Sequence, residues 1–212
     1  MPEYRKRFKA VFSSEPTYGG TLKAVAEYLK TLRSEDAPYD RFIKGDPEAI
    51  SEQARRGFEL FRGEAGCVQC HHGPMLTDNE FHALGVPENR AIFKEPKRHI
   101  TFRRFLRTLG VTGYAELRED VGRYSVTKNA ADRKRFKTPS LREVGRTAPY
   151  MHNGMFATLE DVLEFYTRTR KISLTVAQRG DLVAFLKTLS GKPVPPPDVK
   201  RPPYALRKLG EN

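Results

Sequence analysis

One short string, Cys67-Val68-Gln69-Cys70-His71, constrains this chain more than any other feature of its sequence. The chain has two cysteines in all, and both lie in this string. Two thiols separated by two residues can add to the two vinyl groups of one haem, and the imidazole that follows is then held beneath the iron. The spacing therefore predicts one covalently attached c-type haem, held by Cys67, Cys70 and His71.

Three other kinds of site use a similar pair of cysteines. A structural zinc site needs four ligands, usually from two such pairs, and the chain has no third cysteine. A thioredoxin-like dithiol would lie between a strand and a helix, whereas this string follows a predicted helix and precedes a His-Gly-Pro sequence. A structural disulfide would leave the adjacent His71 unexplained. Covalent haem is the interpretation that accounts for all three residues.

The composition limits the classes of partner. Of the 212 residues, 38 are Lys or Arg and 26 are Asp or Glu, which gives a formal net charge of +12. Such a charge attracts acidic partners, and no recognised nucleic-acid module accompanies the basic residues. We therefore predict an acidic protein partner and no nucleic acid. No apolar run approaches the length needed to span a bilayer, so no membrane span is expected.

Periodic apolar residues and capping pairs predict an all-α fold. Thr158 with Asp161, and Thr175 with Gln178, are capping pairs ahead of apolar periodic runs. In the helix that leads to the cysteines, Ala54, Phe58 and Phe61 are expected to face inward. The predicted helices cover residues 21–33, 51–62, 159–166 and 176–189; residues 87–135 are the least regular stretch, and residues 192–203 form a proline-rich extended tail.

Several longer strings carry a resemblance to a known family. The chain resembles the C-terminal half of the bacterial di-haem cytochrome c peroxidases, and more closely their relatives around the methylamine-utilisation enzyme MauG. The resemblance extends from about residue 4 to residue 191. The matching strings are APYDRF (37–42), RGFELFRGEAG with the haem motif (56–71), HGPMLTD (72–78), FHALGV (81–86), GRY (122–124), FKTPSLR (136–142) and TAPYMHNG (147–154).

The resemblance implies an organisation for the chain. It implies a cytochrome c-like haem domain over residues 49–191, with long irregular loops. Residues 1–48 would be a helical segment belonging to the linker or interface with an N-terminal haem domain, and residues 192–212 a proline-rich basic tail. The family has two haems and this chain has one motif and no export signal. We therefore expect the C-terminal part of a longer, exported, periplasmic protein, or a fragment that starts at an internal Met.

The resemblance also implies the second axial ligand of the iron. The family position that carries Met in the peroxidases falls on Tyr166, as it does in MauG-like enzymes. A tyrosine oxygen would lower the reduction potential relative to Met, because axial-ligand identity is one of the protein's main controls on that potential. Tyr166 could instead be a core aromatic at a helix end. Met75, Met151 and Met155 are then the alternatives, with Met155 the foremost.

Charged and oxygen-donating residues complete the predicted site. Haem propionates need charge partners, and Arg suits planar pairs of oxygens, so Arg123 and Arg142 are predicted to bind them. Ordinary surface ion pairs are the alternative for both. The resemblance further implies a calcium ion held by carbonyls of Thr147 and Pro149, with oxygen donors of the kind calcium prefers.

By resemblance the function is that of a c-type haem oxidoreductase, a cytochrome-c peroxidase or MauG-type enzyme. Electrons from a small donor, a cytochrome c or a cupredoxin, would pass through this haem to a second haem that reduces hydrogen peroxide to water. A MauG-like variant would instead oxidise a partner protein. The alternative is a single-haem electron-transfer module without peroxidase turnover, and a third is a basic binding protein whose cysteine pair is incidental.

Overall fold

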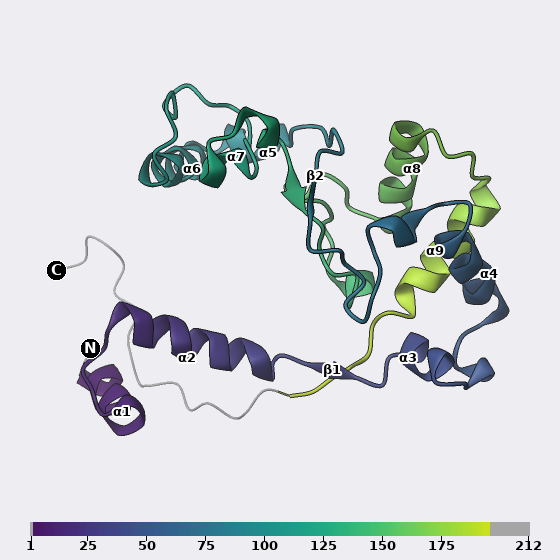
Figure 1. Cartoon of the computed structure of the whole chain (residues 1–212), viewed down its shortest axis with the longest axis horizontal. Coiled ribbons are helices and arrows are strands. Elements are labelled where there is room, and N and C mark those ends of the chain that lie inside the picture. Colours follow the sequence, from purple (N-terminus) through teal and green to yellow (C-terminus); the bar gives the residue numbers. More distant parts are fainter. Residues whose placement is uncertain (1, 196–212) are drawn as a thin grey trace. The chain divides into compact units, whose positions relative to one another are not determined.

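The computed structural model describes residues 2–195, apart from the side chain of Phe93, and shows a mostly helical chain (Figure 1). Contacts divide it into two compact units. One contains the residues up to Glu35 together with the segment from Lys192, and the other is Asp36–Gly191. Residues 36–48 thus group with the second unit, whereas the domain boundary predicted from the sequence lies after residue 48. The family role assigned to residues 1–48 stays a prediction, and the tail beyond residue 195 lies outside the described residues.

The described part of the first unit is built from two helices and a short strand pair. These are α1 (Pro2–Phe12), α2 (Tyr18–Thr31) and β1 (Ser34–Glu35), which pairs antiparallel with β4 (Lys192–Pro193). Helix α2 begins earlier than the predicted 21–33, because the Thr17 hydroxyl accepts a hydrogen bond from the Gly20 amide at 3.0 Å and caps it. The apolar stripe of α2 that contains Leu22, Val25 and Leu29 is about half exposed.

Three capped helices form the framework of the second unit. They are α4 (Glu52–Arg62), α8 (Leu159–Arg170) and α9 (Val176–Lys187). Both predicted capping pairs are confirmed as complete capping boxes, at Thr158 with Asp161 and at Thr175 with Gln178. Ala54, Phe58 and Phe61 are buried as predicted. Helix α8 continues four residues past the predicted end at residue 166.

Helices α4 and α9 cross at Gly57. A Cβ atom at this position would lie 2.0 Å from the backbone oxygen of Asp181 and 2.9 Å from the Cβ of Phe185, so only glycine allows the two backbones to approach this closely. The ring of Phe185 is fully buried and packs 5.3 Å from the Phe58 ring and 5.1 Å from the Phe61 ring. This contact forms the main core, and it fixes the end of α4 from which the cysteine motif follows.

The remaining elements of this unit, apart from α6, are short. A two-stranded ribbon joins β2 (Phe81–His82) to β3 (Phe136–Lys137) antiparallel. Residues 90–135, which lie between these two strands in the sequence, form what we call the basic lobe, whose separate small core contains Leu106, Val111 and Val121. The other helical segments are α3 (Pro38–Ile43), η1 (Pro47–Ala49), η2 (Cys67–Gln69), α5 (Arg90–Lys94), α6 (Pro96–Thr108), α7 (Tyr124–Thr127), η3 (Ala130–Asp132) and η4 (Val144–Arg146).

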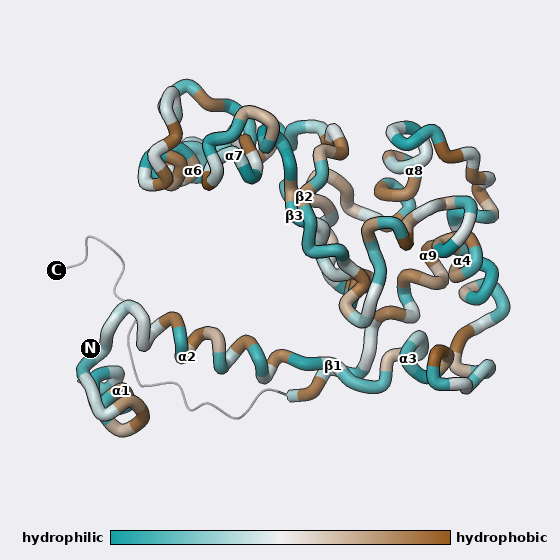
Figure 2. Tube along the Cα trace, in the orientation of Figure 1, coloured by the Kyte–Doolittle hydropathy of each residue, from teal (hydrophilic) through white to brown (hydrophobic). Residues whose placement is uncertain are grey.

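The 13-residue helix α6 lies in the stretch that the sequence marked as least regular. Its apolar positions are interrupted by cations, which hides the helical period, as the colours along α6 in Figure 2 illustrate. Within residues 2–195, none of the helices is both long enough and apolar enough to cross a membrane.

Candidate functional site

A deep cavity of about 410 Å³ lies between the cysteine motif, the β2–β3 ribbon and helices α8 and α9. Most of its wall is apolar, with Phe61, Leu163 and Leu186 among the lining residues. Cys67, Cys70, His71 and Tyr166 line the same cavity. Residues predicted from separate parts of the sequence therefore meet around one space, and its wall suits a flat, mostly apolar group.

The motif enters this cavity through a tight turn. Gly66 has a left-handed backbone with φ of +63°, which a residue with a side chain rarely adopts, and it leads into η2. The amides of Cys70 and His71 both donate to the Cys67 carbonyl, at 3.2 and 2.9 Å. The two cysteines and the histidine are thus held on one compact turn.

A second turn orients the imidazole of His71. The Nδ1 atom lies 3.0 Å from the carbonyl oxygen of Leu76, which can only accept a hydrogen bond, so Nδ1 carries the proton. The Leu76 amide donates to Gly73 at 3.0 Å, and the Asp78 amide donates to Cys70 at 2.8 Å, which fixes this turn under the ring. Nε2 is left with a free lone pair, as a metal ligand requires. Burial lowers the pKa of His71, which keeps the imidazole neutral.

The thiols and the phenol of the cavity are held in their protonated forms. Burial raises the pKa of Cys67 to about 11 and also raises that of Cys70. No disulfide joins the two. Burial raises the pKa of Tyr166 to about 12. A redox-active dithiol depends on a thiolate at neutral pH, so the thioredoxin-like alternative does not suit these cysteines.

Cys70 also lies beside Asp78 and His82, and the ligand atoms of these three residues are within 4.8 Å of one another. Cys67 is not in this group, and a structural zinc site needs four ligands. Both carboxylate oxygens of Asp78 are already engaged: the imidazole of His82 lies 2.7 Å from one, and the Glu80 amide donates to the other at 2.9 Å. Burial alone would raise the pKa of Asp78, but these hydrogen bonds outweigh it and hold the pKa well below its usual range.

The structure separates the four residues weighed as second axial ligand. Tyr166, on α8, and Met151, in the loop before it, line the cavity. Met155, 38% exposed, and Met75, 56% exposed, do not. The assignment to Tyr166 stays a prediction, and it is one that the position of the side chain allows.

Neither predicted arginine lines the cavity. Arg142 lies 2.8 Å from an Asp40 carboxylate oxygen and donates to the Pro74 carbonyl at 2.8 Å. Arg123 lies 3.6 Å from Asp132 and stacks over the Phe81 ring at 4.4 Å. The cations in the lining are Lys134, Lys137 and Arg170, which the sequence reading missed.

Arg170 could have been found from the sequence. It lies four residues after Tyr166, on the same side of a helix. The predicted helix ended at residue 166, four residues before Arg170. Thr147 and Pro149 lie in the cavity wall, and calcium binding by their carbonyls stays a prediction.

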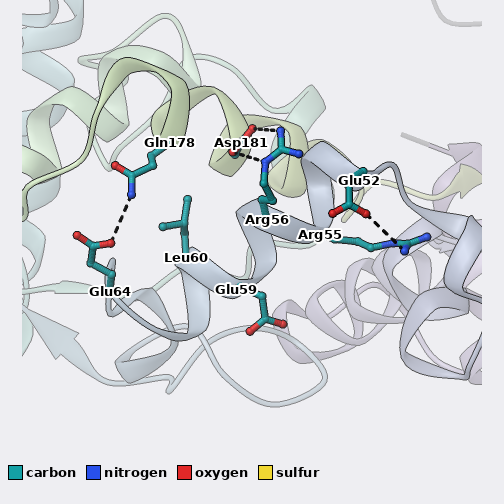
Figure 3. Close-up of a pocket in the computed structure, with 8 residues that line it drawn as sticks. All are labelled: Glu52, Arg55, Arg56, Glu59, Leu60, Glu64, Gln178 and Asp181. Carbon is teal, nitrogen blue, oxygen red and sulfur yellow. Dashed lines mark hydrogen bonds and ion pairs between the residues drawn. The ribbon is translucent and has the colours of Figure 1, made fainter.

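A second hollow, of about 460 Å³, lies on the outer side of α4 and α9 (Figure 3). Four of its charged side chains pair with one another: Arg56 with Asp181 at 3.0 Å, and Arg55 with Glu52 at 3.6 Å. The Gln178 amide donates to Glu64 at 3.4 Å. The contacts of Arg56 with Asp181 and of Glu64 with Gln178 join α4 and the residues after it to α9, and the cavity at the cysteine motif is the candidate site.

Comparisons with known proteins point to one family. The family model described as di-haem cytochrome c peroxidase matches residues 1–48. The cytochrome-c peroxidase IdrP2 of Denitromonas iodatirespirans is 44% identical over 219 aligned positions, covering 100% of this chain and 60% of that protein. The methylamine utilization protein MauG of Methylorubrum extorquens is 32% identical, covering 91% of this chain and 51% of its own length.

A solved structure shares the fold. It is the crystal structure of a MauG-like protein associated with microbial copper homeostasis, which matches with a TM-score of 0.67 at 28% identity. The match covers 89% of this chain and 59% of that one. The all-α expectation is confirmed by this likeness and by the helices themselves.

Proposed function

Because the chain belongs to the di-haem cytochrome c peroxidase and MauG family, we propose that its second unit holds one covalent haem c and transfers electrons within a peroxidase. The chain spans 60% or less of the length of the relatives compared above. Reduction of hydrogen peroxide to water, with two electrons and two protons, or oxidation of a partner protein, is therefore proposed for the whole protein. Electrons would come from a small donor, a cytochrome c or a cupredoxin.

One observation carries the proposal: the hydrogen bond between His71 Nδ1 and the Leu76 carbonyl, in a cavity that both cysteines also line. Cys67 and Cys70 would form the thioether links, and His71 Nε2 would bind the iron. A bound haem c supplies one-electron redox chemistry at its iron. The Leu76 carbonyl keeps the ring of His71 oriented and its Nδ1 proton in place, and the apolar wall excludes water.

Mass spectrometry of the chain, expressed in a host that attaches c-type haem, tests the binding. We expect a haem adduct on the peptide that contains residues 67–71. Each of the variants Cys67→Ser and Cys70→Ser should lose one of the two thioether bonds to the haem. His72→Ala is the matched control, because His72 adjoins the motif and does not line the cavity. A correctly exported chain with both thiols free and no adduct would refute the proposal.

Tyr166 is proposed as the second axial ligand, through its phenolic oxygen. Tyr166→Phe should change the visible and paramagnetic resonance spectra of the ferric protein, while Met151→Leu, at the other weighed residue in the wall, should leave them unchanged. A thioether–iron band in the ferric wild type would exclude Tyr166 as the ligand.

The second candidate function is electron transfer without peroxide turnover. It is favoured by the position of Tyr166 in the cavity, because a haem with two protein ligands has no open site for peroxide. Rapid steady-state peroxide consumption by the purified 212-residue chain would exclude this second candidate. Periplasmic location is also proposed, and export of the full-length protein in its native cell is the test.

A further inference from the structure

The basic lobe carries most of the net charge of the chain. Residues 90–135 contain 13 Lys and Arg against five Asp and Glu, a formal charge of +8 out of +12 for all 212 residues. Helix α6 contains no acidic residue. Charge gathered on one small part of a protein creates a local field that steers partners of opposite sign.

The acidic side chains of the lobe are largely engaged in contacts near their own position. Glu95 lies 2.9 Å from Arg98, Glu119 lies 2.7 Å from Lys134, and Asp132 lies 3.6 Å from Arg123. They neutralise Arg98 in the first turn of α6, and Arg123 and Lys134 in the turns before β3. The cations on the outer side of α6 keep their charge.

Lys97, Ile100, Arg104 and Arg107 form a single stripe along α6, which we call the α6 face. Their spacing of three, four and three residues places them on one side of the helix. The opposite side carries Leu106, which is buried in the lobe core. All four face residues are exposed, Ile100 at 56%. Lys97, Arg104 and Arg107 make no ion pair within residues 2–195.

The lobe also reaches the cavity. Lys134 lines it, and the Lys134 amide donates at 3.0 Å to the carbonyl of Val121, which is fully buried in the lobe core. Glu88 lines the cavity as well and lies 3.9 Å from the Lys134 amine. The lobe is therefore continuous with the wall of the proposed haem site.

We propose that the α6 face is the docking surface for a small acidic electron-donor protein. Three unpaired cations around one exposed aliphatic side chain match a partner with carboxylates around an apolar spot, in the small interface typical of electron-transfer encounters. The two exposed apolar residues of α6, Ile100 and Phe105, are too few to anchor a helix in a membrane surface, which requires a broad apolar face. The inference rests on the proposed electron-transfer function.

Stopped-flow reduction of the ferric holoprotein provides the test. The probe is reduced flavodoxin, a small acidic flavoprotein that passes one electron to the haem and reduces Fe(III) to Fe(II). A triple variant, Lys97→Gln with Arg104→Gln and Arg107→Gln, should lower the bimolecular rate constant about tenfold at low ionic strength and flatten its salt dependence. Ile100→Ser should lower the rate constant without changing the salt dependence.

The matched control removes three charges elsewhere: Lys6→Gln with Lys9→Gln and Lys23→Gln, all exposed on α1 and α2. It should lower the rate constant less than about twofold. An equal fall in both triple variants, or none in the α6 variant, would overturn the proposal. The proposal would also be overturned if the α6 variant reacted with flavodoxin as fast as the wild type and lost only its binding to phosphatidylglycerol vesicles. Reduction by methyl viologen radical, a small cation that does not need the docking surface, tests the haem itself. If the wild-type chain holds no haem, or if methyl viologen radical does not reduce it, the proposed electron-transfer function fails and not only the docking proposal.

Discussion

The α4–α9 pair and the basic lobe belong to the same unit of the chain, but they are stabilised differently. The pair buries large side chains, with Phe58, Phe61 and Phe185 in contact around a glycine crossing. The lobe buries Leu106, Val111 and Val121, under a surface of cations. Apolar burial is the dominant favourable term in folding, so the pair carries the stability of the unit. The lobe is free to carry charge because little of the core depends on it.

The largest expected effect follows from removing the centre of the main core. Phe185 is fully buried and contacts three other aromatic rings, including that of Tyr39 at 5.6 Å. Phe185→Ala should lower the free energy of unfolding by about 3–5 kcal/mol, measured by urea unfolding. The control is Phe105→Ala on α6, a phenylalanine 57% exposed, with an expected change within about 0.5 kcal/mol. Equal losses in both would mean that the lobe shares the stability of the core.

The same substitution in the two regions compares them directly. Leu106 in the lobe and Leu182 on α9 are each 1% exposed. Leu182→Ala should lower the global free energy of unfolding by about 2–5 kcal/mol. Leu106→Ala should act locally, so that amide exchange accelerates within residues 90–135 and stays slow in α4 and α9. Faster exchange throughout the unit after Leu106→Ala would show one cooperative core.

The two regions also differ in how far the sequence predicts them. Side-chain caps and uninterrupted apolar periods identify α4, α8 and α9, because local hydrogen bonds and burial of one helix face follow from nearby residues. Helix α6 escapes prediction because Arg103 and Arg104 interrupt its apolar period. No side-chain hydrogen bond caps its N-terminus.

In the candidate site, too, the sequence predicts local features and misses those that depend on tertiary contacts. The cysteine motif is local, so its residue types and spacing suffice to predict it. The cations of the cavity wall come from β3, the turn before it and the last turn of α8, all of which are far from the cysteine motif in the sequence. Arg123 and Arg142 were chosen by residue type; the structure places both in ion pairs, neither lines the cavity, and their binding to haem propionates stays a prediction. Which arginine reaches a cavity depends on tertiary contacts that no nearby residues encode.

A smaller effect tests the glycine crossing. Gly57→Ala places a Cβ against the Asp181 carbonyl, so the helices must separate, at a cost of about 1–3 kcal/mol by urea unfolding. The control is Gly180→Ala on α9, where the nearest atom to the new Cβ is Gln53 Nε2 at 3.7 Å. This variant should gain up to about 1 kcal/mol from helix propensity. Gly57→Ala with unchanged stability would show that α4 and α9 are not held at this distance.

The smallest expected effect depends on pH and concerns the ion pair on the outer side of α4 and α9. Asp181 accepts two hydrogen bonds from Arg56, at 3.0 and 3.1 Å, and this guanidinium holds the pKa of Asp181 below its usual range. The folded chain thus keeps Asp181 charged at lower pH than the unfolded chain does. The resulting stabilisation is fully present above the unfolded pKa of about 4 and is lost as the pH falls through the lower folded value.

Arg56→Gln removes the partner, so the variant should be less stable than the wild type between pH 5 and pH 8, and the difference should shrink below about pH 4. Urea unfolding of both proteins at pH 7, 5 and 3.5 measures this. Arg168→Gln is the control, because its ion pair with Glu164, at 3.8 Å, is exposed on both sides and should add no pH-dependent difference. A difference that persists unchanged at pH 3.5 would mean that Arg56 stabilises the helix pair by packing its aliphatic stem. The α4–α9 contact would then depend on apolar burial alone, which would sharpen its contrast with the charged lobe.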